Sequence, residues 1–216
     1  MKEWLRFSVC WWHTFVGGGG SDPFGAPTYI RDWEEGFEPN TIELSKRRID
    51  VAFEFFTKLG VEYYCFHDFD VAPEGETIEE SWKNLDIITD YLKEKQDETG
   101  VKLLWATQNL FSNPRYMNGG MTNPDVDVFC HSAAAIQKVC DINHKLGGLN
   151  HVFWGGREGY QSLLNTDLKK EYVFKVVIGI ACVVMNCTRL CMRSREMTGS
   201  HTHTHILSLV HFIHPT

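Results

Sequence analysis

This 216-residue sequence has fewer basic than acidic residues. It has 21 Lys and Arg against 28 Asp and Glu, which gives a formal net charge of −7. A protein that binds nucleic acid uses Lys and Arg to displace counterions from the phosphate backbone. The acidic balance therefore predicts no nucleic-acid partner and favours a small molecule or another protein.

The sequence also lacks a long uncharged apolar segment. The longest such run, Val176 to Met185, is about half of the roughly 20 residues that a membrane-spanning helix requires. The first residues include Glu3 and have no continuous apolar stretch of the kind found in secretory signal peptides. We expect neither a membrane anchor nor a signal peptide.

There is no C-x-x-C pair, although the chain has seven cysteines. Three of them lie inside strand-like or helix-like apolar runs. The pattern predicts reduced thiols and therefore a cytoplasmic location. The seven are Cys10, Cys65, Cys130, Cys140, Cys182, Cys187 and Cys191.

Strand-like and helix-like segments alternate over the first 160 residues or so. Strands are expected at 6–15, 63–71, 103–111 and 151–160, and helices at about 40–60, 77–98 and 124–146. This order predicts parallel strands with right-handed crossovers, in either an open doubly wound sheet or a barrel. Because no Gly-x-Gly-x-x-Gly follows the first strand, the dinucleotide-binding form of the open sheet is disfavoured.

A histidine and two carboxylates lie where the second expected strand ends, in Phe66-His67-Asp68-Phe69-Asp70. An imidazole exchanges protons near neutral pH, and a carboxylate on its far nitrogen fixes its tautomer. This chemistry suits the opening of a cyclic sugar, in which the anomeric hydroxyl loses a proton and the ring oxygen gains one. Side chains alternate along a strand, so His67 and Asp70 can pair only if the chain turns after Asp68. The alternative is a structural histidine.

Each of the other expected strand ends contributes a tryptophan near a small polar or charged group. These are Trp12 with Thr14, Trp105 with Thr107, and Trp154 before Gly155-Gly156-Arg157-Glu158. Aromatic faces beside polar groups suit a polyol. A single tryptophan of this kind is more often part of a core, whereas three at successive strand ends favour a sugar pocket.

The composition changes near residue 172. Residues 1–172 hold 27 acidic and 17 basic residues, whereas 173–216 hold one acidic and four basic residues and five of the ten histidines. Three histidines form the alternating run His201-Thr-His203-Thr-His205, which we interpret as low-complexity sequence, with a metal site through alternate imidazoles as the alternative. We expect one domain over 1–171 and an irregular tail over 172–216.

Six motifs, in order, resemble those of the xylose isomerases, of the class II form. They are Asp22-Pro-Phe24-Gly25, the run from Phe66 to Val71, Trp105 to Phe111, Asn113 to Tyr116, Val152 to Tyr160, and Leu163 to Asp167. The resemblance covers residues 1–171. It implies an α/β fold, a (β/α)8 TIM barrel truncated here to about four βα units.

The resemblance also implies residue roles. His67 would be the acid–base group that opens the sugar ring, and Asp70 the carboxylate that orients it. Trp105 and Trp154 would wall the pocket. The remaining implied contacts with the sugar are Trp12, Thr14, Thr107 and Val152, and Phe24 would reach into a neighbouring subunit's site. The family interconverts D-xylose and D-xylulose by a metal-assisted hydride shift in a homotetramer, with D-glucose as a further candidate substrate.

The hydride shift needs two divalent cations, Mg, Mn or Co, whose ligands and nearby Lys come from strands five to eight of the family. The resemblance ends near Lys170-Glu171, and the tail has no Glu-Pro-Lys-Pro or Asn-x-Glu-x-Asn-His run. We therefore expect the metal ligands to be absent and the chain to be an inactive fragment. We interpret the tail as translated non-coding or wrongly joined sequence. The alternative function is a non-catalytic fragment that associates with full-length subunits.

Overall fold

Strands and helices alternate in the computed structural model, which describes residues 7–16, 31–162, 165–166, 169 and 172. The strands are β1 (Ser8–Cys10), β2 (Tyr63–His67), β3 (Lys102–Thr107), β4 (Asn150–His151), β5 (Tyr160–Ser162) and β6 (Asn165–Thr166). The helices are α1 (Trp11–Thr14), α2 (Ile42–Leu59), α3 (Asp68–Val71), α4 (Ile78–Thr99) and α5 (Val126–Lys145), with short 3-10 turns η1 (Asp32–Glu34) and η2 (Pro114–Tyr116).

Two of the long helices have ends that the sequence specifies locally. The Thr41 hydroxyl accepts a hydrogen bond from the Leu44 amide and so caps the start of α2, which stops at Gly60 with φ of 72°. In the same way Thr77 caps α4, and Gly100 ends it with φ of 76°. These boundaries agree with the predicted helices to within one or two residues.

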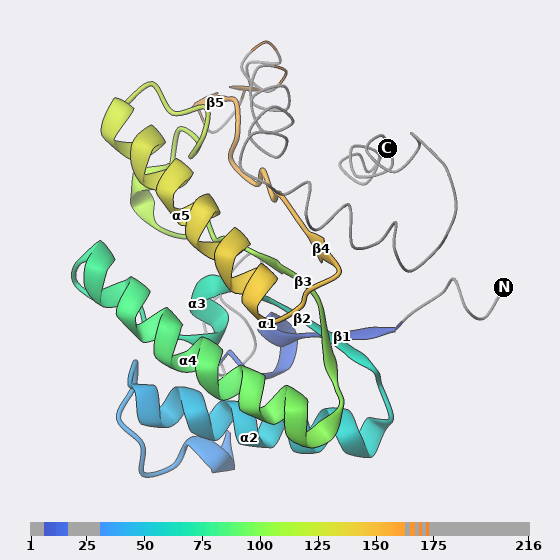
Figure 1. Ribbon diagram of the computed structural model, residues 1–216. Helices are drawn as coiled ribbons and strands as arrows, with labels where there is room; N and C mark the ends of the chain where they lie inside the picture. The colour runs from blue at the N-terminus through green and yellow to red at the C-terminus, as the bar shows by residue number, and fades with distance from the viewer. Residues whose placement is uncertain (1–6, 17–30, 163–164, 167–168, 170–171, 173–216) are drawn as a thin grey trace, which may run out of the picture.

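The first four strands form one parallel sheet in the order β1-β2-β3-β4, and β5 and β6 form a separate antiparallel pair. Figure 1 shows α2, α4 and α5 along the same side of the four-stranded sheet. In a doubly wound sheet the strand order reverses and helices cover both faces. The described sheet has neither property. Its strands follow one another in chain order, and α2, α4 and α5 all lie on one face.

The helix-facing side of β2 forms the centre of the core. Tyr64 and Phe66 are at most 1% exposed. The Tyr64 ring stacks on that of Phe56 from α2, with 5.7 Å between the ring centroids. Because side chains alternate along a strand, Cys65 and His67 point to the opposite face of the sheet. That face, free of the helices α2, α4 and α5, carries the candidate site.

Each expected strand proves shorter at its carboxyl end. β1 ends at Cys10 and β2 ends at His67, because the residues that follow form the helical turns α1 and α3. Hydrogen bonds between neighbouring residues replace the ladder at these points. The fourth strand, expected with its terminal loop over 151–160, is β4 at Asn150–His151, with one further ladder hydrogen bond from the Val152 amide. The loop that follows is held by the side chains of Arg157 and Glu158.

Of the regions singled out in the sequence, the motif at 163–167 is described only in part, and two others lie outside the described residues. One is Phe24, and the other is the tail from 173 to 216. Among the helices that the structure does describe, none is long and apolar enough to cross a membrane.

Candidate functional site

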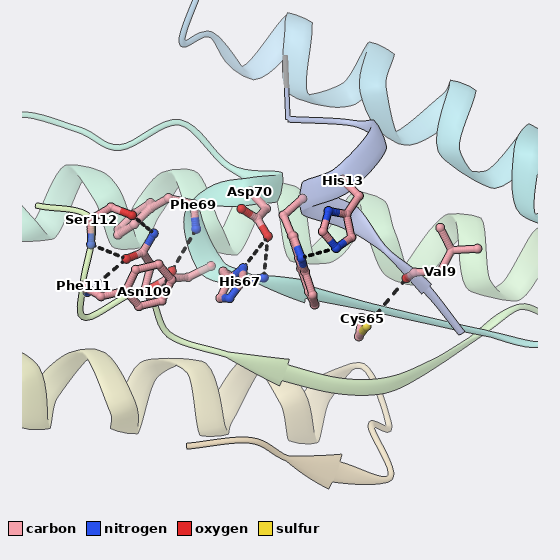
Figure 2. A network of polar contacts seen from close by, with 11 residues as sticks. Val9, His13, Cys65, His67, Phe69, Asp70, Asn109, Phe111 and Ser112 are labelled. Atoms are coloured by element: carbon pink, nitrogen blue, oxygen red, sulfur yellow. Dashed lines mark hydrogen bonds and ion pairs between the residues drawn. The ribbon is translucent and has the colours of Figure 1, made fainter. Parts of the chain in front are cut away.

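His67 and Asp70 are paired at the end of β2. Asp70 Oδ2 lies 2.8 Å from both the backbone nitrogen and the Nδ1 atom of His67. The chain turns directly after His67, one residue earlier than predicted. The helical turn α3 then brings Asp70 back beside His67. Figure 2 shows both contacts as dashed lines to the same carboxylate.

This pairing fixes which nitrogen of the imidazole faces the open side. An ionised carboxylate only accepts hydrogen bonds, so Nδ1 carries the proton that it donates to Asp70. Nε2 is then the nitrogen available to exchange a proton with a ligand. The His67 side chain is 13% exposed and that of Asp70 is 10% exposed. The pair is therefore sheltered, but not sealed from a ligand.

Aromatic rings surround His67. The Trp12 ring lies 4.6 Å from the His67 ring, and the Trp105 ring lies 5.7 Å from Trp12. Phe111 meets the other side of His67 edge-on at 5.5 Å. Two of the three predicted tryptophans thus line one site together with a phenylalanine that the sequence analysis did not single out.

Trp154 is placed less directly. It lies in the connection after β4, is 54% exposed, and its ring contacts that of Phe111 at 6.4 Å. Phe111 therefore separates Trp154 from His67 in the described structure. All three tryptophans lie near the carboxyl end of a strand: Trp12 follows the end of β1, Trp105 lies shortly before the end of β3, and Trp154 follows β4.

The small residues predicted to line the sugar lie at different depths. Thr107 ends β3, pairs in register with His67, and is 1% exposed. Its hydroxyl has no hydrogen-bond partner among the described residues, which is uncommon for a buried polar atom. Val152 continues the β3–β4 ladder through its amide, 3.3 Å from the Ala106 carbonyl oxygen. Thr14 ends α1 and is half-buried.

Asp68 does not join the His67 pair. It is 3% exposed, and its Oδ1 accepts hydrogen bonds from the Asn109 and Phe69 amides at 2.9 and 3.0 Å. Burial raises the pKa of Asp68 to about 7, against the lowering effect of these two donors. It lines a cavity of about 150 Å³, also bordered by Trp82, Tyr116 and His131. Asp68 thus ties the end of β2 to the end of β3.

The Gly-Gly-Arg-Glu run holds the loops around the site. Glu158, 3% exposed, accepts hydrogen bonds from the amides of Gly120, Met121 and Thr122 at 2.8 to 3.0 Å, and from the Thr122 hydroxyl at 2.6 Å. Arg157 donates to the Phe111 carbonyl at 2.8 Å. Sequence reasoning treated these residues as polar groups beside Trp154, whereas they position the connection that carries Phe111.

The carboxylates near His67 do not fit a metal centre. In the part of the chain that the structure describes, no group of three or more His, Cys, Asp or Glu side chains is arranged to hold a metal ion. Asp70 is engaged by His67, and Asp68 by backbone amides. For the whole chain, the absence of metal ligands stays a prediction.

A large part of the chain is similar to proteins named xylose isomerase. It is 58% identical to the one from Rhizobium rhizogenes over 171 residues, which is 79% of this chain and 38% of that protein. Identity is 55% to the one from Hordeum vulgare and 54% to the one from Arabidopsis thaliana, each over 79% of this chain and 35% of the relative. The chain thus spans little more than a third of the length of these relatives. No family model matches it.

Proposed function

We propose that this chain carries the sugar-binding and ring-opening portion of an aldose–ketose isomerase, since 171 of its residues are similar to part of a protein named xylose isomerase. The observation that supports this most directly is the His67–Asp70 pair at the end of a parallel strand, with Trp12 and Phe111 against the imidazole. Ring opening needs a proton-exchanging group, and the neighbouring aromatic rings suit the binding of a sugar.

The ring-opening step uses the protonation state that Asp70 imposes. Nε2 of His67 takes the proton from the anomeric hydroxyl, the bond between the anomeric carbon and the ring oxygen breaks, and the anomeric carbonyl forms. The ring oxygen then takes a proton from the His67 imidazolium, which returns the histidine to its neutral form and leaves the sum of atoms and charge unchanged. Asp70 stabilises the imidazolium that forms in between.

The fold supports a wider proposal about architecture. Strands β1 to β4 follow one another in chain order, with α2, α4 and α5 on one side of the sheet. That winding is the pattern of a (β/α)8 barrel, in which functional groups gather at the carboxyl ends of the strands. We propose that residues 1–171 make the first four βα units of such a barrel and that 172–216 is an unrelated tail.

Properties of the complete relatives are part of the same proposal. They are D-xylose as the substrate, D-glucose as a further one, a homotetramer, a cytoplasmic location and two divalent cations that polarise the sugar oxygens during the hydride shift. In this chain we expect ring opening without isomerisation. The described residues supply the acid–base pair and do not gather a metal site.

Mutarotation tests the proposed step, because the two anomers of D-xylose interconvert only through the open chain. We expect the folded chain to accelerate the anomerisation of α-D-xylose, followed by polarimetry, and His67→Gln to abolish the acceleration. His144→Gln, an exposed histidine in the last turn of α5, is the matched control. A folded wild-type chain that leaves the rate unchanged would refute ring opening.

Conversion to D-xylulose separates ring opening from isomerisation. We expect no D-xylulose from this chain with added magnesium or manganese. We expect activity once the C-terminal part of a relative is joined to it. Formation of D-xylulose by the chain alone would show that the metal ligands are present after all.

A non-catalytic role in association is the second candidate. In the described sheet β1 and β4 are edge strands, and an uncovered edge is a template for pairing with another chain. Phe7 beside β1 is also 81% exposed. Co-expression with the complete Hordeum vulgare relative and affinity pull-down tests this role. Recovery of a mixed assembly with reduced isomerase activity would favour it, and separate elution would exclude it.

A further inference from the structure

Two cysteines face each other across the first two strands, directly below the candidate site. Cys10 ends β1, and Cys65 is its partner in the parallel register of β1 and β2. Neighbouring strands lie about 4.8 Å apart, and a disulfide spans Cα atoms separated by about 4.4 to 6.8 Å. The backbone spacing of this pair is therefore compatible with a covalent link.

The two thiols differ in environment. Cys65 is 1% exposed, and its sulfur lies 3.7 Å from both the Val9 carbonyl oxygen and the Ser8 hydroxyl oxygen. Cys10 is partly exposed. A small oxidant therefore reaches Cys10 more readily than Cys65. Figure 2 shows Cys65 beside Val9, on the same strand as His67.

The pKa values of the two thiols also differ, and the difference again favours reaction at Cys10. Contact with the neighbouring Cys65 thiol lowers the pKa of Cys10 to about 7, assisted by the nearby His67, while burial and Asp70 oppose the effect. The same contact and burial raise the pKa of Cys65. Cys10 is thus the thiol that ionises near neutral pH, with Cys65 beside it as a protonated partner.

We propose that Cys10 and Cys65 form a peroxide-sensitive dithiol, in which Cys10 reacts first and Cys65 closes the disulfide. This adds a covalent modification site to the chain. An experiment on this site measures the oxidation state of two sulfur atoms, so its result does not depend on sugar binding.

The reaction takes two steps with hydrogen peroxide as the oxidant. The Cys10 thiolate attacks one peroxide oxygen, the O–O bond breaks, and a sulfenic acid and hydroxide form; the hydroxide takes up the proton that Cys10 released. The Cys65 sulfur then attacks the sulfenic sulfur, and water leaves with the Cys65 proton. Overall two thiols and one peroxide give one disulfide and two waters.

The link would fasten the site itself. Trp12 and His67 each follow the cysteine of their own segment by two residues, and their rings lie 4.6 Å apart. A bond between Cys10 and Cys65 would therefore fix β1 against β2 immediately below that ring pair. Reduction by a dithiol would release it.

Peptide mapping tests the proposal on the full chain. We expect that treatment with equimolar hydrogen peroxide at pH 7, alkylation of the remaining thiols and non-reducing digestion will give a Cys10–Cys65 peptide as the main disulfide. Dithiothreitol should reverse it. A link of Cys10 to another cysteine, or first oxidation at the exposed Cys130, would overturn the proposal.

Variants assign the order of the two steps. In Cys65→Ser we expect Cys10 to stop at the sulfenic acid and to be labelled by dimedone, whereas Cys10→Ser should leave Cys65 unlabelled. Cys130→Ser is the matched control and should keep the link.

If a variant fails to fold, the rate at which Cys10 is labelled in the unmutated chain tests whether Cys10 is the reactive thiol. At pH 7 the Cys10 thiol should react with iodoacetamide about ten-fold faster in the folded chain than in urea, because a larger fraction is thiolate. Equal rates in the folded and unfolded chain would contradict the assignment of Cys10 as the reactive thiol.

Discussion

Replacement of Asp68 by Asn tests how the end of β2 is tied to β3. Asp68 is buried, and its Oδ1 accepts from the amides of Asn109 and Phe69. An asparagine keeps an oxygen for both donors but carries no charge. The cavity of about 150 Å³ that Asp68 lines leaves room for the new amide group. Asp68→Asn should therefore fold like the wild type and remove one buried ionisation.

The magnitude follows from the pKa of Asp68. Burial raises this pKa from 3.8 to about 7 in the folded chain, so the folded state binds the proton more tightly than the unfolded state. Its contribution to stability is present in full below about pH 4 and is lost as the pH rises through 7. At about 1.4 kcal/mol per pKa unit, the loss from pH 5 to pH 8 is about 2 to 3 kcal/mol.

Urea unfolding followed by circular dichroism at pH 5 and pH 8 measures this. We expect the free energy of unfolding of the wild type to fall by about 2 to 3 kcal/mol more than that of Asp68→Asn over this interval. Comparing the two proteins removes the contribution of the histidines to this pH dependence, because they titrate in both. Equal falls in the two proteins would refute the buried, proton-binding state of Asp68.

The remaining predictions concern groups around the same site. Glu158→Ala leaves four donors without their acceptor and should cost about 3 to 5 kcal/mol of unfolding free energy, whereas the exposed Glu54→Ala should leave the unfolding free energy almost unchanged; equal costs would contradict the loop-holding role. Thr107→Val removes a buried hydroxyl without a partner and should raise the free energy of unfolding by up to about 1 kcal/mol, with a decrease arguing for an undetected partner. Asp70→Asn should slow mutarotation about 100-fold or more without abolishing the binding of D-xylose, since it disturbs the tautomer of His67; an unchanged rate would exclude the orienting role.

The sequence was a good guide where the interactions are local. The start and end of α2 and α4 follow from Thr41, Gly60, Thr77 and Gly100, because cap hydrogen bonds join residues close in the chain. The parallel βα order likewise agrees with the predicted alternation. The strand ends were less predictable. Aromatic and β-branched residues favour a strand, yet short helical turns after Cys10 and His67 satisfy the same backbone groups.

The pairing of His67 with Asp70 was predictable from the sequence in part, and in part it depends on the tertiary structure. The need for a turn was evident from the spacing, because residues three apart point to opposite faces of a strand. The position of the turn after His67, and the direction in which Asp68 faces, go with a tertiary contact between Asp68 and the Asn109 amide in the loop after β3. No local pattern encodes that contact.

By itself the sequence determined the chemistry available at the sheet's carboxyl end, namely an imidazole, a carboxylate and several tryptophans, and the resemblance that gives them a substrate class. The tertiary structure alone decided which of them meet. Trp12 lies against His67, Cys10 lies opposite Cys65, and Glu158 holds the loop at 120–122. These contacts depend on the register between strands and on loops far apart in the chain, and register is set by the packing of the whole sheet.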